Sequence, residues 1–281
     1  MRSRNILLVA ACLAAPLLAC AHGDIHDQIV MVTRQIQLEP ENAKLYLKRG
    51  ELHRVHGDWD SALSDYDQVA RLAPTLADVD FYRGMALLES GLTKPARACL
   101  DKFLAKQPDH AEGLITRARA LAKLGEGKAA AMDFSHALSR MAEPKPDYYL
   151  ERAQALASAG DAHLAEALCG LEEGMKRLGP LLSLQLKTID LEVSRKNLDG
   201  ALLRLDKILG QSPRRETWLV RKGQLLQQAG RVGEARESFA GALRAIESLP
   251  PNHRNSRAMI ALENQVRAAL GTPALAAVAP R

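Results

Sequence analysis

Apolar side chains recur at helical spacing from the first polar stretch of the chain onward. In residues 22–38 the apolar positions are Ile25, Ile29, Val32 and Ile36, three or four residues apart, with polar residues between most of them. This spacing places them on one face of a helix with 3.6 residues per turn. The pattern predicts a single amphipathic helix over 22–38.

Two further helices are predicted directly after it, at 43–56 and 59–72. Gly57 and Asp58 separate them, since glycine readily adopts the left-handed conformation that ends a helix and aspartate caps the start of the next. Pro74 then stops the second helix, because proline lacks the N–H that a continuing helix needs. Helices of about 14 residues are marginal alone in water, so each must bury its apolar stripe against neighbours.

The helix pair repeats along the chain with a period of 34 residues. Arg49 corresponds to Arg83 and, one period later, to Arg117. The same shift superposes four further markers: Gly50 on Gly84, Gly57 on Gly91, Ala62 on Ala96 and Pro74 on Pro108. Self-similarity at a fixed period of this length is typical of solenoids, in which one helical hairpin is stacked repeatedly. The sequence therefore predicts an all-α fold.

The order of the markers resembles the tetratricopeptide repeat (TPR) family. That family has a large residue four positions before a glycine, then a turn glycine, an alanine, an aromatic residue and a final proline. The first unit fills these places with Tyr46, Gly50, Gly57, Ala62, Tyr66 and Pro74. The resemblance implies a right-handed α-solenoid of about six TPR hairpins, whose first helices line a concave groove.

The resemblance also divides the chain into segments. The expected solenoid covers 42–250, with repeats at 43–76, 77–110, 111–144, 146–179, 182–215 and 216–249. The expected flanks are a signal peptide at 1–21, an N-terminal capping helix at 22–41, a C-terminal capping helix at 251–270 and a flexible tail at 271–281. Capping helices are expected because the terminal hairpins of a solenoid expose an apolar face.

Two repeats depart from the pattern. In the fourth, Tyr149, Ala153 and Ala165 align with the family's large residue and two small residues. The fifth lacks both glycines and has Ile189 and Lys196 in their places. Because the glycines allow helices to approach and turn, the fifth repeat is expected to have altered curvature.

The N-terminus is predicted to be an export signal, and the alternative is a short N-terminal membrane anchor. Residues 1–21 combine two early arginines with an uncharged apolar run that is too short to span a bilayer comfortably. Two cleavage sites remain open. A lipobox-like ending would make Cys20 the lipidated first residue, whereas a small-x-small site would release a chain that begins at His22. Either one places the protein outside the cytoplasm, in the periplasm or, if lipidated, at the outer membrane.

Charge is distributed unevenly. The chain has a formal net charge of +5, and from residue 180 onward it holds 16 Lys/Arg against 9 Asp/Glu. The usual meaning is a solvated surface, and the alternative is a docking surface for an acidic partner. With only 4% aromatic residues and an export signal, nucleic acid is not an expected partner.

The sequence predicts a binding scaffold and no enzyme. It contains no glycine-rich phosphate loop, no H-E-x-x-H, no C-x-x-C and no G-x-S-x-G, and no cofactor is expected. The predicted ligand is a peptide or helix of a protein partner of unknown identity. The groove residues implied by the resemblance are Lys44, Leu47, Glu51, Arg54, Phe81, Met85, Leu88, Ile115 and Arg119. Helix packing is the alternative role of each of them.

A different function rests on the residues that follow the signal. His22, Asp24 and His26 would open the mature chain if cleavage precedes His22. A free amine, an imidazole and a carboxylate in this arrangement could chelate copper or zinc. The alternative function is therefore a periplasmic metal-binding protein.

Overall fold

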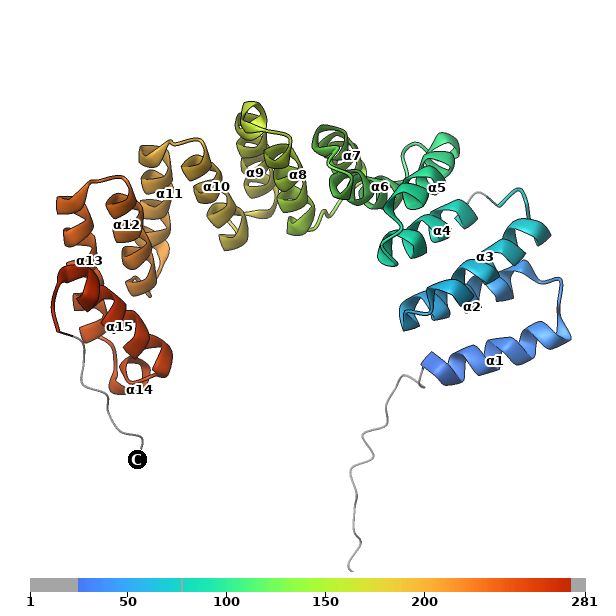
Figure 1. The fold of residues 1–281 in the computed structure, drawn as a ribbon, viewed down its shortest axis with the longest axis horizontal. Coiled ribbons are helices and arrows are strands. Elements are labelled where there is room, and N and C mark those ends of the chain that lie inside the picture. The colour runs from blue at the N-terminus through green and yellow to red at the C-terminus, as the bar shows by residue number, and fades with distance from the viewer. Residues whose placement is uncertain (1–24, 77, 274–281) are drawn as a thin grey trace, which may run out of the picture. The chain divides into compact units, whose positions relative to one another are not determined.

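A computed structural model describes residues 25–76 and 78–273 of the chain, which are helical with no strand within these ranges. Figure 1 shows helices that follow one another as antiparallel pairs. The first helices are α1 (Ile25–Leu38), α2 (Ala43–His56), α3 (Trp59–Leu72), α4 (Asp78–Glu89), α5 (Thr93–Lys106), α6 (Ala111–Lys123) and α7 (Gly127–Arg140). The remainder are α8 (Pro146–Ser158), the 3₁₀ turn η1 (Asp161–His163), α9 (Leu164–Leu178), α10 (Leu182–Ser194), α11 (Leu198–Gln211), α12 (Glu216–Gln228), α13 (Val232–Glu247), α14 (Pro251–Arg254) and α15 (Arg257–Leu270).

The helices form six hairpins, numbered 1 to 6 here. The pairs are α2–α3, α4–α5, α6–α7, α8–α9, α10–α11 and α12–α13, each with a first and a second helix. The described chain divides into two compact units, Met1–Phe103 and Leu104–Arg281, with the boundary inside α5. The predicted α-solenoid architecture of six hairpins between flanking helices is confirmed.

Unit 1 is built on the aromatic and small residues of hairpin 1. Its core includes the fully buried Tyr66 and Ala62, with Val79 and Ala86 from α4 packed against them. The Tyr66 and Tyr82 rings stack with centroids 6.0 Å apart. The apolar stripes of α2, α3 and α4 therefore meet in one cluster, as the helical spacing requires.

Unit 2 consists of nearest-neighbour packing along the chain. From α6 to α13 each helix packs against the next one along the chain, and α15 packs on α13. The last cluster joins Leu202 of α11, Phe239 of α13 and Val266 of α15. Since α15 covers the final hairpin, the apolar face of α13 is buried.

The glycines predicted at the helix crossing lie where a Cβ has no room. A Cβ added to Gly50 would come within 2.6 Å of the Tyr66 ring, and one on Gly223 within 2.8 Å of the Phe239 ring. Both distances are far below van der Waals contact, so a side chain here would push the helices of the hairpin apart.

Hairpin 5 solves the same two problems with other residues. Ile189 is fully buried at the crossing and packs in a cluster with Leu205, an aliphatic residue in place of an aromatic ring. Lys196 takes the turn position with φ of 60°, the one positive φ among non-glycine residues in the described ranges. The left-handed region costs an L-residue roughly 1–2 kcal/mol, so this turn is strained.

The strain predicts that Lys196→Gly stabilises the protein by about 0.5–1 kcal/mol, because relief of the left-handed strain exceeds the extra entropy of an unfolded glycine. Gly230 has the equivalent turn conformation (φ 74°) in hairpin 6, and no atom lies near where its Cβ would be. Gly230→Lys should therefore destabilise by a similar amount. Urea unfolding measures both, and a destabilised Lys196→Gly would contradict the assignment of strain.

Two details of the predicted repeats are wrong. Ala165 is exposed, and the buried small residue of α9 is Ala167, because η1 lengthens the turn and shifts the register of α9 by two positions.

The C-terminal cap is not one helix. Its chain turns at Ser256, whose hydroxyl accepts from the Met259 N–H at 3.3 Å and starts α15 separately from α14.

Candidate protein-interaction face

The first helices of hairpins 3 to 6 are joined by a row of polar contacts, here named the polar ladder. It consists of Arg119 of α6 with Glu151 of α8, Gln154 of α8 with Lys187 of α10, and Asp190 of α10 with Arg221 of α12. The Arg119 pair is bidentate, with N–O distances of 2.7 and 2.8 Å. Each contact skips the intervening second helix, so the ladder lies on a face that belongs to the first helices.

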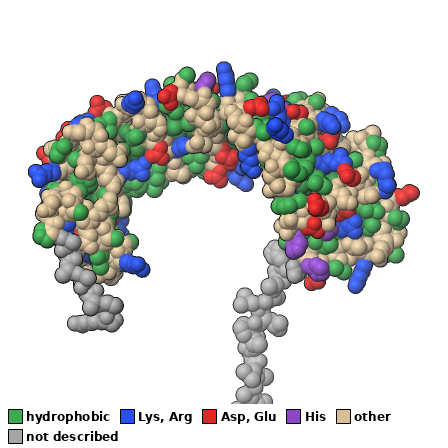
Figure 2. All heavy atoms as spheres, viewed as in Figure 1, with side chains coloured by type: hydrophobic (Ala, Val, Ile, Leu, Met, Phe, Trp, Pro, Cys, Tyr) green, Lys and Arg blue, Asp and Glu red, His purple; other side chains and the backbone are tan. Residues whose placement is uncertain are grey.

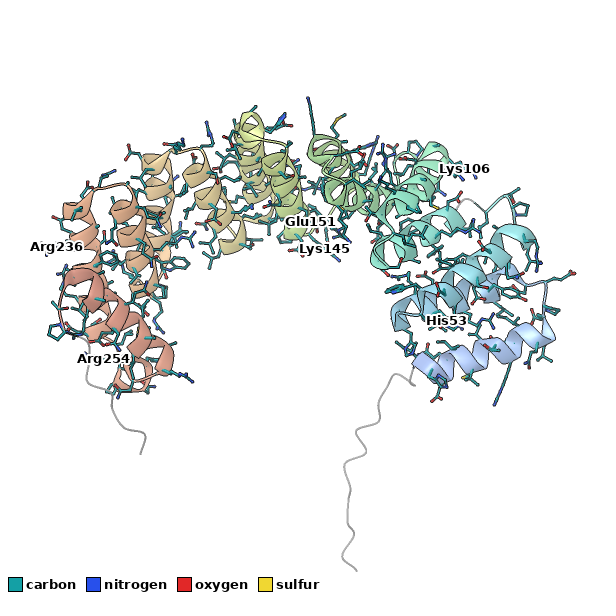
Figure 3. All side chains as sticks on the ribbon, in the orientation of Figure 1. His53, Lys106, Lys145, Glu151, Arg236 and Arg254 are labelled. Carbon is teal, nitrogen blue, oxygen red and sulfur yellow. The ribbon has the colours of Figure 1, made fainter. Side chains whose placement is uncertain are left out.

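Helical geometry explains why the ladder is continuous. Glu151 and Gln154 are three residues apart on α8, and Lys187 and Asp190 are three apart on α10. Residues at this spacing lie on the same helix face, so each middle helix contacts the helix before and the helix after. Figure 3 labels Glu151 on α8, and Figure 2 shows acidic and basic side chains next to one another on this part of unit 2.

The ladder remains accessible to solvent. Arg119 is 45% exposed and Glu151 31%, and the Arg119 guanidinium also lies 5.8 Å from the Tyr148 ring centroid. The hydrogen bond to Glu151 raises the pKa of Arg119 above its ordinary value, so the arginine stays charged. Exposed ion pairs contribute only about 0–1 kcal/mol each, and a partner can exchange them at small cost.

Unit 1 carries a related cluster. Arg54 of α2 donates to both carboxylate oxygens of Glu89 on α4, at 2.6 and 2.9 Å, and to Glu51 at 3.2 Å. The Tyr66 hydroxyl donates to Glu51 from the core side. Burial raises the pKa of Tyr66, and the hydrogen bond to Glu51 raises it further, so the phenol stays protonated. The predicted groove residues Glu51 and Arg54 are thus brought together.

Three predicted groove residues do not face a ligand. Phe81, Leu88 and Ile115 are buried, with exposures of 7%, 6% and 3%. Phe81 packs on Phe103, with ring centroids 5.2 Å apart. A first helix is flanked by neighbours on both sides, so only a narrow stripe of it is left for a partner, and these apolar residues fall outside that stripe.

The remaining predicted groove residues differ in exposure. Lys44 is exposed, whereas Leu47 is partly buried against the core of unit 1 and Met85 is partly buried on α4. The sequence also predicts an apolar patch around Phe81 and Met85 in the groove, and of these two only Met85 keeps an accessible part. The accessible part of this face is charged.

The predicted metal and lipid sites cannot be placed in the same way. Cys20, His22 and Asp24 lie outside the described residues, and His26 is an exposed residue of α1. Across 25–76 and 78–273, no three His, Cys, Asp or Glu side chains gather closely enough to hold a metal ion. In the same ranges no helix combines the length and apolarity needed to cross a membrane.

Sequence reasoning missed the partners of the ladder. Glu89, Glu151, Lys187, Asp190 and Arg221 were not among the predicted site residues. A signal was present, since oppositely charged partners lie 31 to 35 residues apart along the chain, close to one repeat. Such spacing places them at nearly equivalent positions of successive first helices.

Comparison with known proteins decides the family. The sequence profile of the "Tetratricopeptide repeat" matches residues 47–94, 81–137 and 186–250, together more than half of the chain. The chain belongs to the tetratricopeptide repeat family. Among curated relatives, human Tetratricopeptide repeat protein 28 is 30% identical over 105 residues, which are 37% of this chain and 4% of that protein. The mouse protein is 29% identical over the same length. The chain therefore spans only a small part of these relatives.

Solved TPR structures share the fold. A C-terminal part of a TPR protein from Cytophaga hutchinsonii superposes with a TM-score of 0.65 at 11% identity, covering 85% of this chain and 94% of that one. YrrB gives 0.55 at 21% identity, covering 68% and 97%. PilW gives 0.55 at 20% identity, covering 70% and 91%. At these identities the likeness shows the TPR fold, so the binding properties of this TPR chain must come from its own residues.

Proposed function

We propose that this TPR chain is a non-catalytic scaffold that binds a peptide or helix of a protein partner on its first-helix face. The observation that carries the proposal is the polar ladder. It presents exchangeable polar contacts, two of which are ion pairs, on four successive first helices, with charges of both signs at intervals set by the repeat. A partner with complementary charges can replace these weak pairs with its own.

Known TPR proteins offer precedents for this kind of role. YrrB is described as a TPR protein with an unusual peptide-binding site, and PilW as a type IV pilus biogenesis factor. For this chain we propose an exported protein of the cell envelope, on the basis of the signal-like residues 1–21. The mass of the mature protein tests this. Cleavage before Cys20 with added lipid places the protein at a membrane, cleavage before His22 leaves it soluble in the periplasm, and an uncleaved chain would overturn export.

Site-directed photocrosslinking in the producing cell tests the binding face. A photoreactive residue at Gln154 or Lys187, both on the ladder, is expected to trap the same discrete partner. Met132 provides the matched control, because it is 67% exposed on α7, a second helix. Crosslinks from Met132 alone, with none from the ladder positions, would refute the proposal. Arg119→Glu should reduce the yield at Gln154 without changing the Tm by more than the small contribution of one exposed pair.

A further inference from the structure

A second recurring arrangement lies between the second helices. In hairpin 1, Arg49 of α2 donates to Thr33 of α1 at 3.2 Å and to both oxygens of Asp65 on α3 at 2.8 and 2.6 Å. The three residues are 16 positions apart in sequence. We name the space between three such residues the slot. One residue comes from the helix before the hairpin, one from the first helix of the hairpin and one from the second helix of the same hairpin.

In hairpins 1, 3 and 4, an arginine from the first helix fills the slot. In hairpin 3, Arg117 donates to Asp133 at 2.7 and 2.8 Å, repeating the Arg49–Asp65 pair. In hairpin 4, the buried Arg152 crosses the slot and donates to the Gly170 carbonyl at 2.9 Å. A bidentate arginine–carboxylate pair fills space and links two helices at once.

Hairpin 5 reverses this arrangement. Its slot residues are Glu172, Thr188 and Arg204, so the long cation comes from the second helix and the first helix supplies only a short hydroxyl. Arg204 donates to Glu172 on α9 and to Glu192 on α10, the latter at 3.3 Å. Because Thr188 is much smaller than arginine and is itself buried, the slot is left hollow.

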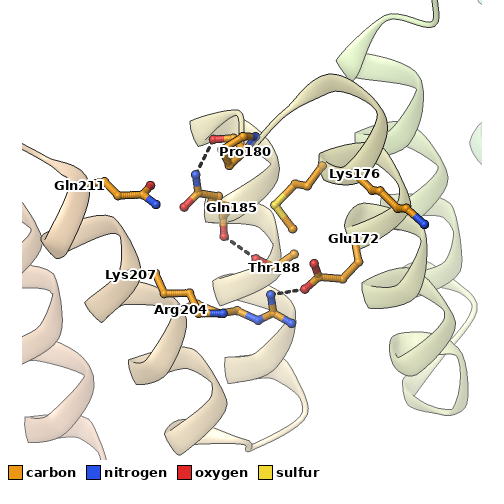
Figure 4. Close-up of a pocket in the computed structure, with 9 residues that line it drawn as sticks. Glu172, Lys176, Pro180, Gln185, Thr188, Arg204, Lys207 and Gln211 are labelled. Carbon is orange, nitrogen blue, oxygen red and sulfur yellow. Dashed lines mark hydrogen bonds and ion pairs between the residues drawn. The ribbon is translucent and has the colours of Figure 1, made fainter.

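The hollow is a cavity of about 320 Å³ between α9, α10 and α11. Figure 4 shows Arg204 joined to Glu172, and the Gln185 amide donating to the Pro180 carbonyl, with Gln211 across from Gln185 on α11. Lys176 and Lys207 stand at its edge on α9 and α11. Within the described residues, neither lysine forms an ion pair or a side-chain hydrogen bond.

Hairpin 6 also has a cavity, which lies beside its slot. The slot holds Lys222, which pairs with Asp206 of α11 at 2.6 Å, and Ser238 in place of an acid. The adjoining cavity measures about 570 Å³ and is lined by Arg215 and Arg244. Neither arginine has a charged partner among the described residues, and Glu237 is the one acid in the lining.

We propose that the cavities of hairpins 5 and 6 form an acceptor surface for an acidic segment of a protein partner. The first cavity lies between α9, α10 and α11 and the second between α12 and α13. None of the polar ladder residues lines either cavity, so the two surfaces can be tested separately. Four cations that have no partner among the described residues (Lys176, Lys207, Arg215 and Arg244) line two cavities large enough to admit carboxylate side chains. Charge complementarity favours glutamate or aspartate, since a concave site lined by several cations attracts an entering anion.

The excess of basic residues supports the same partner. From residue 180 onward the chain has 16 Lys/Arg against 9 Asp/Glu. Many of these acids are already used inside the protein, as Glu192 is by Arg204 and Asp206 by Lys222. Among the described residues, Lys207, Arg215 and Arg244 at the two cavities belong to the cations that these acids leave unpaired. Few aromatic side chains accompany them, which disfavours a nucleic acid.

Fluorescence anisotropy with the full chain tests the proposal. The probe is a labelled peptide of alternating glutamate and alanine, and the control probe has glutamine in place of glutamate. We expect the glutamate peptide alone to bind, and added salt to weaken it. Lys207→Glu/Arg244→Glu should weaken binding about tenfold or more. The matched control, Lys94→Glu/Lys128→Glu, reverses two exposed lysines of other hairpins and should leave binding unchanged.

A second variant separates binding from folding. Thr188→Arg/Arg204→Asp restores the arrangement of hairpins 1 and 3 and fills the cavity, with Glu172 placed to accept from the introduced guanidinium. The Tm of this variant should equal or exceed that of the wild type, while its affinity for the glutamate peptide should fall about tenfold. Undiminished binding by this variant and by Lys207→Glu/Arg244→Glu would overturn the proposal. Stronger binding of single-stranded DNA or of anionic vesicles than of the peptide would also overturn it, in favour of another partner class.

Discussion

Tyr149→Ala is expected to lower the free energy of unfolding by about 3–5 kcal/mol, the range for removing a large aromatic side chain from a core. Tyr149 of α8 is fully buried, and its ring lies against the backbone of Gly174 on α9, where an added Cβ would come within 2.8 Å. The Arg152 guanidinium also lies 5.3 Å from the ring centroid. No neighbour can fill the space of the ring, since the glycine carries no side chain.

Tyr149→Phe is the matched variant, and it should raise the free energy of unfolding instead of lowering it. The Tyr149 hydroxyl is buried and has no hydrogen-bond partner in the part of the chain that the structure describes. A buried unsatisfied polar group costs about 1–3 kcal/mol, so its removal should stabilise the protein while the ring packing stays intact. The alanine variant removes packing, and the phenylalanine variant removes only the hydroxyl.

Urea unfolding followed by circular dichroism distinguishes the two effects. Because solenoid hairpins contact mainly their neighbours, hydrogen exchange should also show the loss concentrated in α8 and α9 for Tyr149→Ala. A Tyr149→Phe variant that is destabilised by as much as 1 kcal/mol would mean that the hydroxyl is satisfied. A mild Tyr149→Ala effect would mean that hairpin 4 repacks.

Glu263→Gln should destabilise the C-terminal helix α15. Glu263 of α15 is fully buried and accepts from Arg267 at 2.8 Å and from Arg254 at 3.3 Å. Removing the charge leaves both arginines without this partner, and because they remain partly exposed we expect a loss of about 2 kcal/mol. The effect should be local, with faster exchange of the α15 amides.

The same carboxylate predicts a pH dependence. Burial raises the pKa of Glu263, but the hydrogen bonds from Arg267 and Arg254 outweigh it, and the pKa lies below its ordinary value. A carboxyl with a lowered folded-state pKa contributes its full stability above its unfolded pKa, about 4.3, and loses it as the pH falls through the folded value. The wild type should therefore lose α15 protection in acid, whereas the Glu263→Gln variant should lack this step.

Measuring α15 exchange across the acid range in both proteins checks the prediction. The difference between wild type and Glu263→Gln should be constant near neutral pH and vanish in acid. A variant of Gln265, an exposed neighbour on the same helix, serves as control and should follow the wild type. If the difference in α15 exchange between the two proteins grew toward low pH instead, the pH dependence would have the opposite sign. That result would refute the conclusion that the ion pairs of Glu263 stabilise α15.

The helices and their order followed from sequence because their signals are local. Helix α2 begins at Ala43 and α3 ends at Leu72, as the caps and Pro74 predict. The errors also have local causes. In α9 a lengthened turn moved the buried position from Ala165 to Ala167, a change of register that a period of 34 residues does not reveal.

The candidate site was predictable only in part, because burial depends on neighbours from other repeats. Phe81 and Arg54 both lie on first helices, yet Phe81 packs against Phe103 while Arg54 pairs with Glu89. Amphipathic spacing identifies the buried face of a helix that has one neighbour. It does not identify the narrow accessible stripe of a helix that has neighbours on both sides.

The sequence by itself determined the hairpin architecture, since Gly50, Gly57 and Pro74 act through backbone geometry and short-range packing that recur every 34 residues. Only the tertiary structure showed what lies between the hairpins. Arg204 and Arg49 are both arginines near a slot, but one comes from a second helix and leaves a cavity while the other comes from a first helix and fills it. That difference depends on which side chain crosses the space between helices, and contacts across that space are set by packing rather than by residue type.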